Sequence, residues 1–219
     1  MNKKIFAQLL GYSQNNLDKV TQPYILETFG VEVARCDTLE QYTDAINDAS
    51  LDRYFSKYWE NDIKKWKYSG LALVDEVNSL RPRAVLDVGC GYNEFKGKID
   101  NLIGIDPYND KADIQVSTLE YRTTQKFDVM LCLGSVNCGS RDKRISEVGR
   151  CVDLLEDGGT MFFRVNPGVQ HNKPEAKWIE FFAWNVPFII ELSEIFNLKV
   201  LDIRDDSNQR KYFIYRKVK

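Results

Sequence analysis

Two acidic residues, each at the end of a short apolar run, have the types and spacing that a binding site requires. Asp87 lies in the run Val85-Leu86-Asp87-Val88, which breaks into the turn Gly89-Cys90-Gly91, and Asp106 ends a second apolar run nineteen residues later. A buried carboxylate is costly without a partner, and glycines let the backbone turn sharply and let a ligand approach it closely. We therefore expect a binding turn in which Asp87 meets a partner.

Apolar runs that alternate with helical patterns predict the elements that position these acids. Predicted strands begin near residues 85, 102, 113, 127, 160, 199 and 212, and predicted helices span 141–155 and 186–196. The turn Asp205-Asp206-Ser207-Asn208 makes the last two strands a hairpin. The pattern predicts an α/β fold with a seven-stranded, mostly parallel sheet, an antiparallel last strand and helices on both faces. Ligands of such sheets bind at the carboxyl ends of the strands, where Asp87 and Asp106 would be neighbours.

The connection between the second and third predicted strands is short. Only residues 107–112 join them, whereas a parallel crossover usually needs about a dozen residues. We expect the helix at this place to be missing or reduced to a loop, and the strand at 113–116 to be vestigial.

The N-terminal part of the chain is predicted to be helical. Residues 1–50 would form a helical extension and residues 51–219 the α/β domain, whose first stretch, 52–80, has apolar residues at three- and four-residue spacing. Five basic residues lie among the aromatic ones of this stretch: Arg53, Lys57, Lys64, Lys65 and Lys67. They form either a surface for a nucleic acid or an anionic substrate or the solvated face of an amphipathic helix, which we favour because Glu60 and Asp62 dilute the charge.

Composition narrows the class of protein. The 219 residues include 43% hydrophobic and 28% charged residues with a net charge of −2, as in a globular protein for which nucleic acid is not the favoured partner. An eighteen-residue apolar run and a signal-peptide pattern are absent, so we expect a cytoplasmic protein with no membrane partner. The five cysteines form no CxxC pair, which suits a reducing compartment and predicts no metal site.

Four motifs in order make residues 80–219 resemble the class I, Rossmann-like methyltransferases that use S-adenosylmethionine. The motifs are Asp87-Val88-Gly89-Cys90-Gly91, Gly104-Ile105-Asp106, Phe127-Asp128-Val129-Met130-Leu131 and Leu154-Leu155-Glu156-Asp157-Gly158-Gly159-Thr160. The chain as a whole resembles small methyltransferases of phage or bacterial type. A dinucleotide site would want a third glycine where Glu94 stands. The family's own usual third glycine is replaced by Asn93, which tolerates a left-handed conformation.

The resemblance implies S-adenosylmethionine as cofactor and a role for each matching residue. Asp87 would meet the cofactor's ammonium group or order a water beside it, and Asp106 would accept hydrogen bonds from the ribose hydroxyls. Other residues would approach the methionine end, flank the adenine or border the acceptor. They are Gly89, Cys90, Gly91, Pro107, Thr118, Leu119, Leu133 and Gly134.

Fewer residues in the sequence indicate where the methyl acceptor would bind. His171, the single histidine, follows Asn166-Pro167-Gly168 and would lie on the rim of the pocket, where it could deprotonate a hydroxyl; we favour the alternative of a solvent-exposed loop histidine. Asn137 and Asn166 are further polar candidates near the acceptor. The Asn/Asp-Pro-Pro-aromatic motif of amino-methylating DNA enzymes is absent after the fourth strand, where Gly134-Ser135-Val136-Asn137 stands, so methylation of DNA bases is not expected.

The function that the resemblance implies is methyl transfer to an oxygen or nitrogen of a small molecule or an exposed biomolecular end. Two alternatives differ in class. Aminopropyl transfer would want an acidic pocket after the fourth strand, which the sequence does not show. A catalytically silent methyltransferase-like fold would serve as a binding or assembly subunit, with residues 1–50 as its docking arm.

Overall fold

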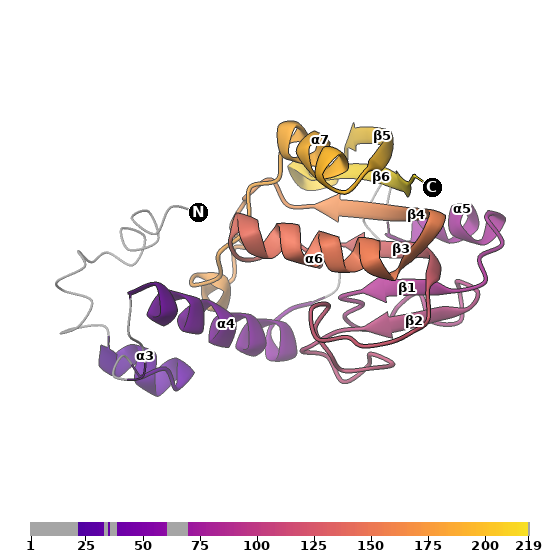
Figure 1. The fold of residues 1–219 in the computed structure, drawn as a ribbon. Helices are drawn as coiled ribbons and strands as arrows, with labels where there is room; N and C mark the ends of the chain where they lie inside the picture. The colour runs from indigo at the N-terminus through magenta and orange to yellow at the C-terminus, as the bar shows by residue number, and fades with distance from the viewer. Residues whose placement is uncertain (1–21, 33–34, 36–38, 61–69, 219) are drawn as a thin grey trace.

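The structure is a computed structural model that describes residues 22–32, 35, 39–60 and 70–218. Its centre is one six-stranded sheet with the strand order β2-β1-β3-β4-β6-β5 (Figure 1). The strands are β1 (Val85–Val88), β2 (Leu102–Ile105), β3 (Phe127–Leu133), β4 (Leu155–Val165), β5 (Leu198–Asp205) and β6 (Lys211–Lys217). Strand β6 runs antiparallel to both of its neighbours, and the other pairs are parallel, as the predicted terminal hairpin requires.

The prediction of seven strands is wrong by one. Segment 113–116 lies beside β2 but forms only the single bridge between Ile105 and Ile114. The Asp113 carboxylate accepts a hydrogen bond from Gly104 N at 2.8 Å, so a side chain takes a place in the backbone ladder. The next side chains along the segment are exposed, so no apolar face favours a longer strand. As expected from the short connection, residues 107–112 form a loop without a helix.

Helices cover both faces of the sheet, as predicted. One face packs on α6 (Arg141–Leu154) and α7 (Val186–Ile195), and the other on the 3-10 turn η4 (Gly70–Leu73) and α5 (Val74–Ser79). The strand residues alternate between the two cores, since Leu86 and Met130 face α6 while Val85 and Val129 face α5. Asn185 caps α7 by accepting a hydrogen bond from Phe188 N, which fixes its start where the sequence predicts it.

The N-terminal helices are α3 (Gln22–Phe29) and α4 (Leu39–Lys57). Helix α4 runs through residue 50 without a break, because no glycine or proline interrupts it and Ser50 hydrogen-bonds back to Ile46 O. The division of the chain at residue 50 stays a prediction. Figure 1 shows α4 beyond the carboxyl ends of the parallel strands. None of the helices in the described part of the chain is both long and apolar enough to cross a membrane.

The packing of α4 places it over the strand ends. Leu51 and Tyr54 are buried in a cluster with residues that follow β4, namely Ala176, Ile179 and Phe181. The Lys173 ammonium group adds a polar tie at the C-terminal end of α4, where it donates to Tyr58 O at 2.6 Å and pairs with Glu60 at 3.0 Å. Helix α4 and the residues just after it therefore form a roof over the carboxyl ends of the strands.

Candidate functional site

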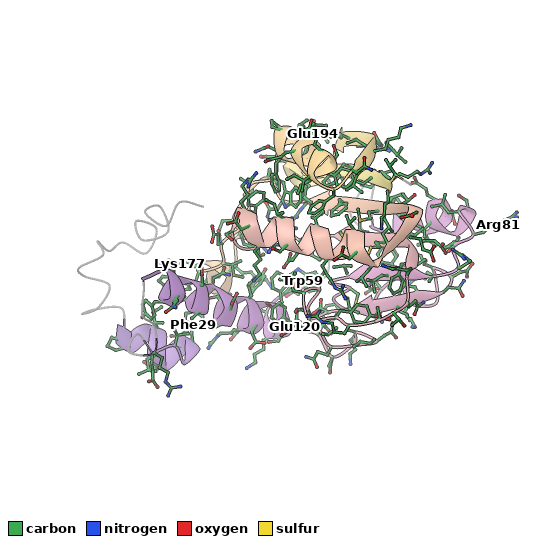
Figure 2. All side chains as sticks on the ribbon, viewed as in Figure 1. Phe29, Trp59, Arg81, Glu120, Lys177 and Glu194 are labelled. Carbon is green, nitrogen blue, oxygen red and sulfur yellow. The ribbon has the colours of Figure 1, made fainter. Side chains whose placement is uncertain are left out.

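A cavity of about 440 Å³ opens between α4 and the carboxyl ends of β1 to β4. All ten residues that the sequence assigns to the cofactor line it: Asp87, Gly89, Cys90, Gly91, Asp106, Pro107, Thr118, Leu119, Leu133 and Gly134. Figure 2 labels two further lining residues, Trp59 beyond the end of α4 and Glu120 in the loop after β2. Residues from Leu51 to Arg210 therefore meet at one place.

The glycine turn after β1 is fixed by backbone hydrogen bonds to β2. Gly89 N and Cys90 N both donate to Ile105 O, at 2.8 and 3.0 Å. Gly89 and Gly91 adopt φ angles of 66° and 54°, which disfavour residues with a Cβ atom. A Cβ at Gly91 would also lie 2.7 Å from Cζ3 of Trp59. Asn93 adopts φ 57°, the left-handed conformation expected of it.

Asp87 is a buried carboxylate that lacks a partner within the described part of the chain. It is 3% exposed, and burial first, then the charge of Asp106, raises its pKa to about 8. A cation placed beside it would reverse this shift, because an opposite charge favours the ionised form. The residue therefore fits a positively charged ligand group.

Asp106 joins the glycine turn to the loop that follows β2. Its Oδ2 accepts from Gly91 N at 3.0 Å, and its Oδ1 accepts from Tyr108 N and Asn109 N at 2.8 and 2.9 Å. Each carboxylate oxygen has two lone pairs. Oδ2 therefore keeps one acceptor site for a ligand hydroxyl.

His171 lines the cavity, but both of its ring nitrogens are occupied. Arg210 Nη2 lies 3.4 Å from Nε2, and Tyr54 Oη lies 3.1 Å from Nδ1. An arginine can only donate, so Nε2 is the acceptor and Nδ1–H donates to the Tyr54 oxygen. Burial first, then Arg210, lowers the pKa of His171 to about 4. The ring is neutral near pH 7, and its basic lone pair is already used.

The two asparagine candidates hold loops together. Asn137 lines the cavity, but its Oδ1 accepts from Asn166 N and its Nδ2 donates to Gly134 O, both at 2.8 Å. Asn166 does not line the cavity. Its side chain accepts from Gly168 N and Val169 N and donates to Val169 O, which closes the turn after β4.

The aromatic roof was not assigned to the site from the sequence. Phe55 stacks on Tyr108 with ring centroids 6.0 Å apart, and Trp59 packs on Tyr92, whose hydroxyl donates to Trp59 O at 2.9 Å. Both roof residues line the cavity. The only signal in the sequence is their four-residue spacing, which places them on one face of a helix. Of the basic residues predicted among the aromatic ones of the stretch 52–80, Arg53 donates to Thr28 O. Lys64, Lys65 and Lys67 lie outside the described residues.

Basic residues at the far end of the cavity were also missed. Lys143 and Arg144 come from α6, Arg164 from β4 and Arg210 from the turn before β6. Ser135, in the loop after β3, also lines the cavity, with an Oγ atom that is buried without a partner in the described part of the chain.

This fold is that of the S-adenosylmethionine-dependent methyltransferases, as predicted. Among the solved structures similar to it is the N-methyltransferase NodS from Bradyrhizobium japonicum WM9 in complex with S-adenosyl-L-homocysteine, with a TM-score of 0.55, 14% identity and coverage of 78% of this chain and 100% of that one. The CcbJ methyltransferase from Streptomyces caelestis gives a TM-score of 0.57 at 14% identity, over 77% of this chain and 96% of that one.

A third similar structure is 1,6-didemethyltoxoflavin-N1-methyltransferase from Burkholderia thailandensis, with bound 1,6-didemethyltoxoflavin and S-adenosylhomocysteine. It gives a TM-score of 0.54 at 14% identity, over 85% of this chain and 88% of that one. The sequence matches no protein-family model and no curated protein. The relationship is therefore one of fold.

Proposed function

We propose that this protein is an S-adenosylmethionine-dependent methyltransferase that acts on an oxygen or nitrogen of a small molecule or an exposed biomolecular end. The observation that carries the proposal is the buried carboxylate of Asp87, which has no partner among the described residues and lies beside a glycine turn in the cavity. When bound, S-adenosylmethionine supplies an electrophilic methyl group. The residues present fit its groups: Asp87 suits the ammonium, and Oδ2 of Asp106 suits a ribose hydroxyl.

The remaining cofactor residues would shape the pocket. Thr118 and Leu119 lie in the loop after β2 and would flank the adenine, while Leu133 and Gly134 at the end of β3 would offer backbone groups to the methionine end. Phe55 and Trp59 would cover the site and exclude water, which strengthens the electrostatic interactions inside.

The chain would promote transfer mainly by holding donor and acceptor in line. Alignment of this kind can supply much of the barrier reduction. His171 would not act as a general base, because its Nε2 lone pair accepts from Arg210 and its lowered pKa of about 4 makes the ring a weak base. It would position Arg210 and Tyr54. An acceptor that needs no deprotonation suits such a site.

Calorimetric titration with S-adenosylmethionine tests the cofactor. We expect the wild type to bind and Asp106→Asn to bind at least tenfold more weakly, since hydrogen bonds to a charged group contribute about 1.5 to 3 kcal/mol. The matched control is Asp110→Asn, which changes an acid in the same loop whose side chain is 81% exposed. No binding by the wild type, or equal binding by all three proteins, would contradict the proposal.

Turnover requires a separate measurement. The protein is incubated with isotopically labelled donor and a metabolite extract, and mass spectrometry searches for products heavier by one labelled methyl group. A labelled product that Asp87→Asn fails to make supports the enzyme. Cofactor binding with no product from any acceptor pool would favour the silent binding subunit instead.

A further inference from the structure

The cavity is electrically polarised along the sheet. The acids Asp87, Asp106, Glu94 and Glu120 come from β1, β2 and the loops that follow them, and the bases Arg164 and Arg210 from β4 and the turn before β6. Helix α6 contributes the bases Lys143 and Arg144 and the acid Glu147. Strands β1 and β6 are three places apart in the sheet (Figure 1). At about 4.8 Å per strand, the strands that position Asp87 and Arg210 are about 14 Å apart. One ligand group of each sign therefore fits the cavity.

Three of the four bases have carboxylate partners. Arg144 pairs with Glu147 at 2.6 Å, Arg164 with Asp206 at 2.8 Å, and Lys143 with Asp48 at 3.4 Å. These pairs neutralise most of the basic end and hold the Arg144 and Arg164 side chains in place.

Arg210 is the exception. It has no ion pair within the described part of the chain, and its Nη1 atom is buried without a hydrogen-bond partner there. The nearby carboxylate of Asp206 is already engaged by Arg164 Nε and Ser207 N. Burial first, then the charge of Arg164, lowers the pKa of Arg210 to about 10, so the guanidinium stays charged near pH 7.

The surroundings hold Arg210 without neutralising it. Nη2 donates to the neutral His171 ring, which itself packs on Phe181 with centroids 4.4 Å apart and the ring planes tilted by 30°. A half-buried guanidinium without an ion pair is a costly arrangement unless an anion completes it. The planar fork of an arginine matches the oxygens of a carboxylate or a phosphate.

We propose that the acceptor carries an anionic oxygen group, a carboxylate or a phosphate, which binds at Arg210 in the basic end of the cavity. This inference rests on the proposed function, in which the acidic end holds the cofactor. His171 acts as a positioning residue for Arg210. The same charges disfavour a polyamine, because the basic end would repel it.

The test measures binding of anions directly. The probes are sodium phosphate and sodium acetate, each compared with sodium chloride at equal ionic strength, with the thermal midpoint of the protein as the readout. At an anion concentration five times its Kd, we expect the midpoint to rise by about 2 to 4 °C. The stronger of the two anions identifies the group as phosphate or carboxylate.

Variants assign the effect to the site. Arg210→Met should abolish the anion-dependent rise, and Arg210→Lys, which keeps the charge but loses the fork, should retain part of it. The control Arg216→Met removes the same charge from an exposed position at the other end of β6 and should leave the rise unchanged. Two-dimensional NMR of the Arg210 variants checks that each is folded.

Failure of the anion site and failure of the proposed function can be told apart, because each thermal midpoint is measured with and without S-adenosylhomocysteine. A rise that depends on Arg210 supports the anion site under both conditions. No rise above chloride in the wild type, or an equal rise in Arg210→Met, overturns it, even where the homocysteine compound binds. Lack of binding of that compound counts against the proposed function alone.

Discussion

We expect Asp87 to link binding of the proposed cofactor to pH. Because its folded-state pKa is raised to about 8 by burial, the carboxyl group is mostly protonated below that pH. The ammonium group of a bound cofactor favours the ionised form, so binding must displace a proton. We expect the affinity for S-adenosylmethionine to rise with pH up to about 8.

The size of the effect follows from one proton per binding event. With a pKa of about 8, the ionised fraction of Asp87 rises from about 1% at pH 6 to about 50% at pH 8, so the affinity should rise about fiftyfold, or about 2.3 kcal/mol, from this group alone. Near the upper end of that range the cofactor's own amine loses its proton, since α-amino groups titrate at about 7.7 to 8.0, and this offsets part of the gain. The affinity should therefore pass through a maximum near pH 8.

Isothermal titration at five pH values, in pairs of buffers with different ionisation enthalpies, measures both the Kd and the protons released. Asp87→Asn should bind more weakly at pH 8, release no proton and lose the acidic limb of the profile. Asp110→Asn should behave as the wild type does. A wild type that releases no proton at pH 6.5, or an unchanged profile in Asp87→Asn, would refute the role of Asp87 as the partner of a cation.

The same pKa shift predicts how stability depends on pH. A folded-state pKa raised above the unfolded value means that the stabilising contribution is complete below about pH 4 and is lost as the pH rises through about 8. Without cofactor, Asp87→Asn should therefore gain stability relative to the wild type between pH 5 and pH 9. Urea unfolding at both pH values checks the sign, and a constant difference would contradict it.

Three further predictions concern residues in or beside the site. Gly91→Ala should weaken cofactor binding at least tenfold, because its Cβ atom would meet Trp59. The control Gly97→Ala, at φ 74° with open space around it, should only lose about 1 to 2 kcal/mol of stability. Adding Trp59→Ala to Gly91→Ala should restore part of the binding, and independent effects of the two substitutions in calorimetry would exclude the contact. Asn166→Ala should lose about 1 to 3 kcal/mol in urea unfolding yet keep turnover per folded molecule, while a selective loss of turnover would revive its catalytic role. His171 should give no limb in the pH profile of turnover between pH 5 and 8, because the pKa of its ring is lowered to about 4, and a limb near 6.5 lost in His171→Gln would contradict this.

Local sequence pattern was sufficient for the parts of the fold in which each element has its own apolar signature. The runs at Val85 and Phe127 are buried strands, and α6 begins where Ser140 caps it. The strand predicted at 113–116 is not formed, because the Asp113 side chain competes for Gly104 N and so decides the pairing of this segment. A propensity pattern carries no information on such competition.

The acidic and basic ends of the cavity also differed in how far the sequence predicted them. Asp87 and Asp106 each end an apolar run, so their position in the sheet could be read from the chain. Arg164 and Arg210 come together because β6, and not β5, lies beside β4. The four-residue spacing of roof residues such as Trp59 predicts that they share one face of a helix, but it does not predict which part of the molecule that face covers.

The order in which the chain is synthesised affects when α4 can pack over the site. Leu51 packs against Ile179, so one side of this contact emerges from the ribosome more than a hundred residues before the other. At about 5 to 20 residues per second, the apolar face of α4 waits on the order of ten seconds for its partner. Strands β1 to β3 have been made by then, so the cavity closes late in folding. Until it does, we expect Leu51, Tyr54 and Phe55, the apolar side chains at the C-terminal end of α4, to be exposed.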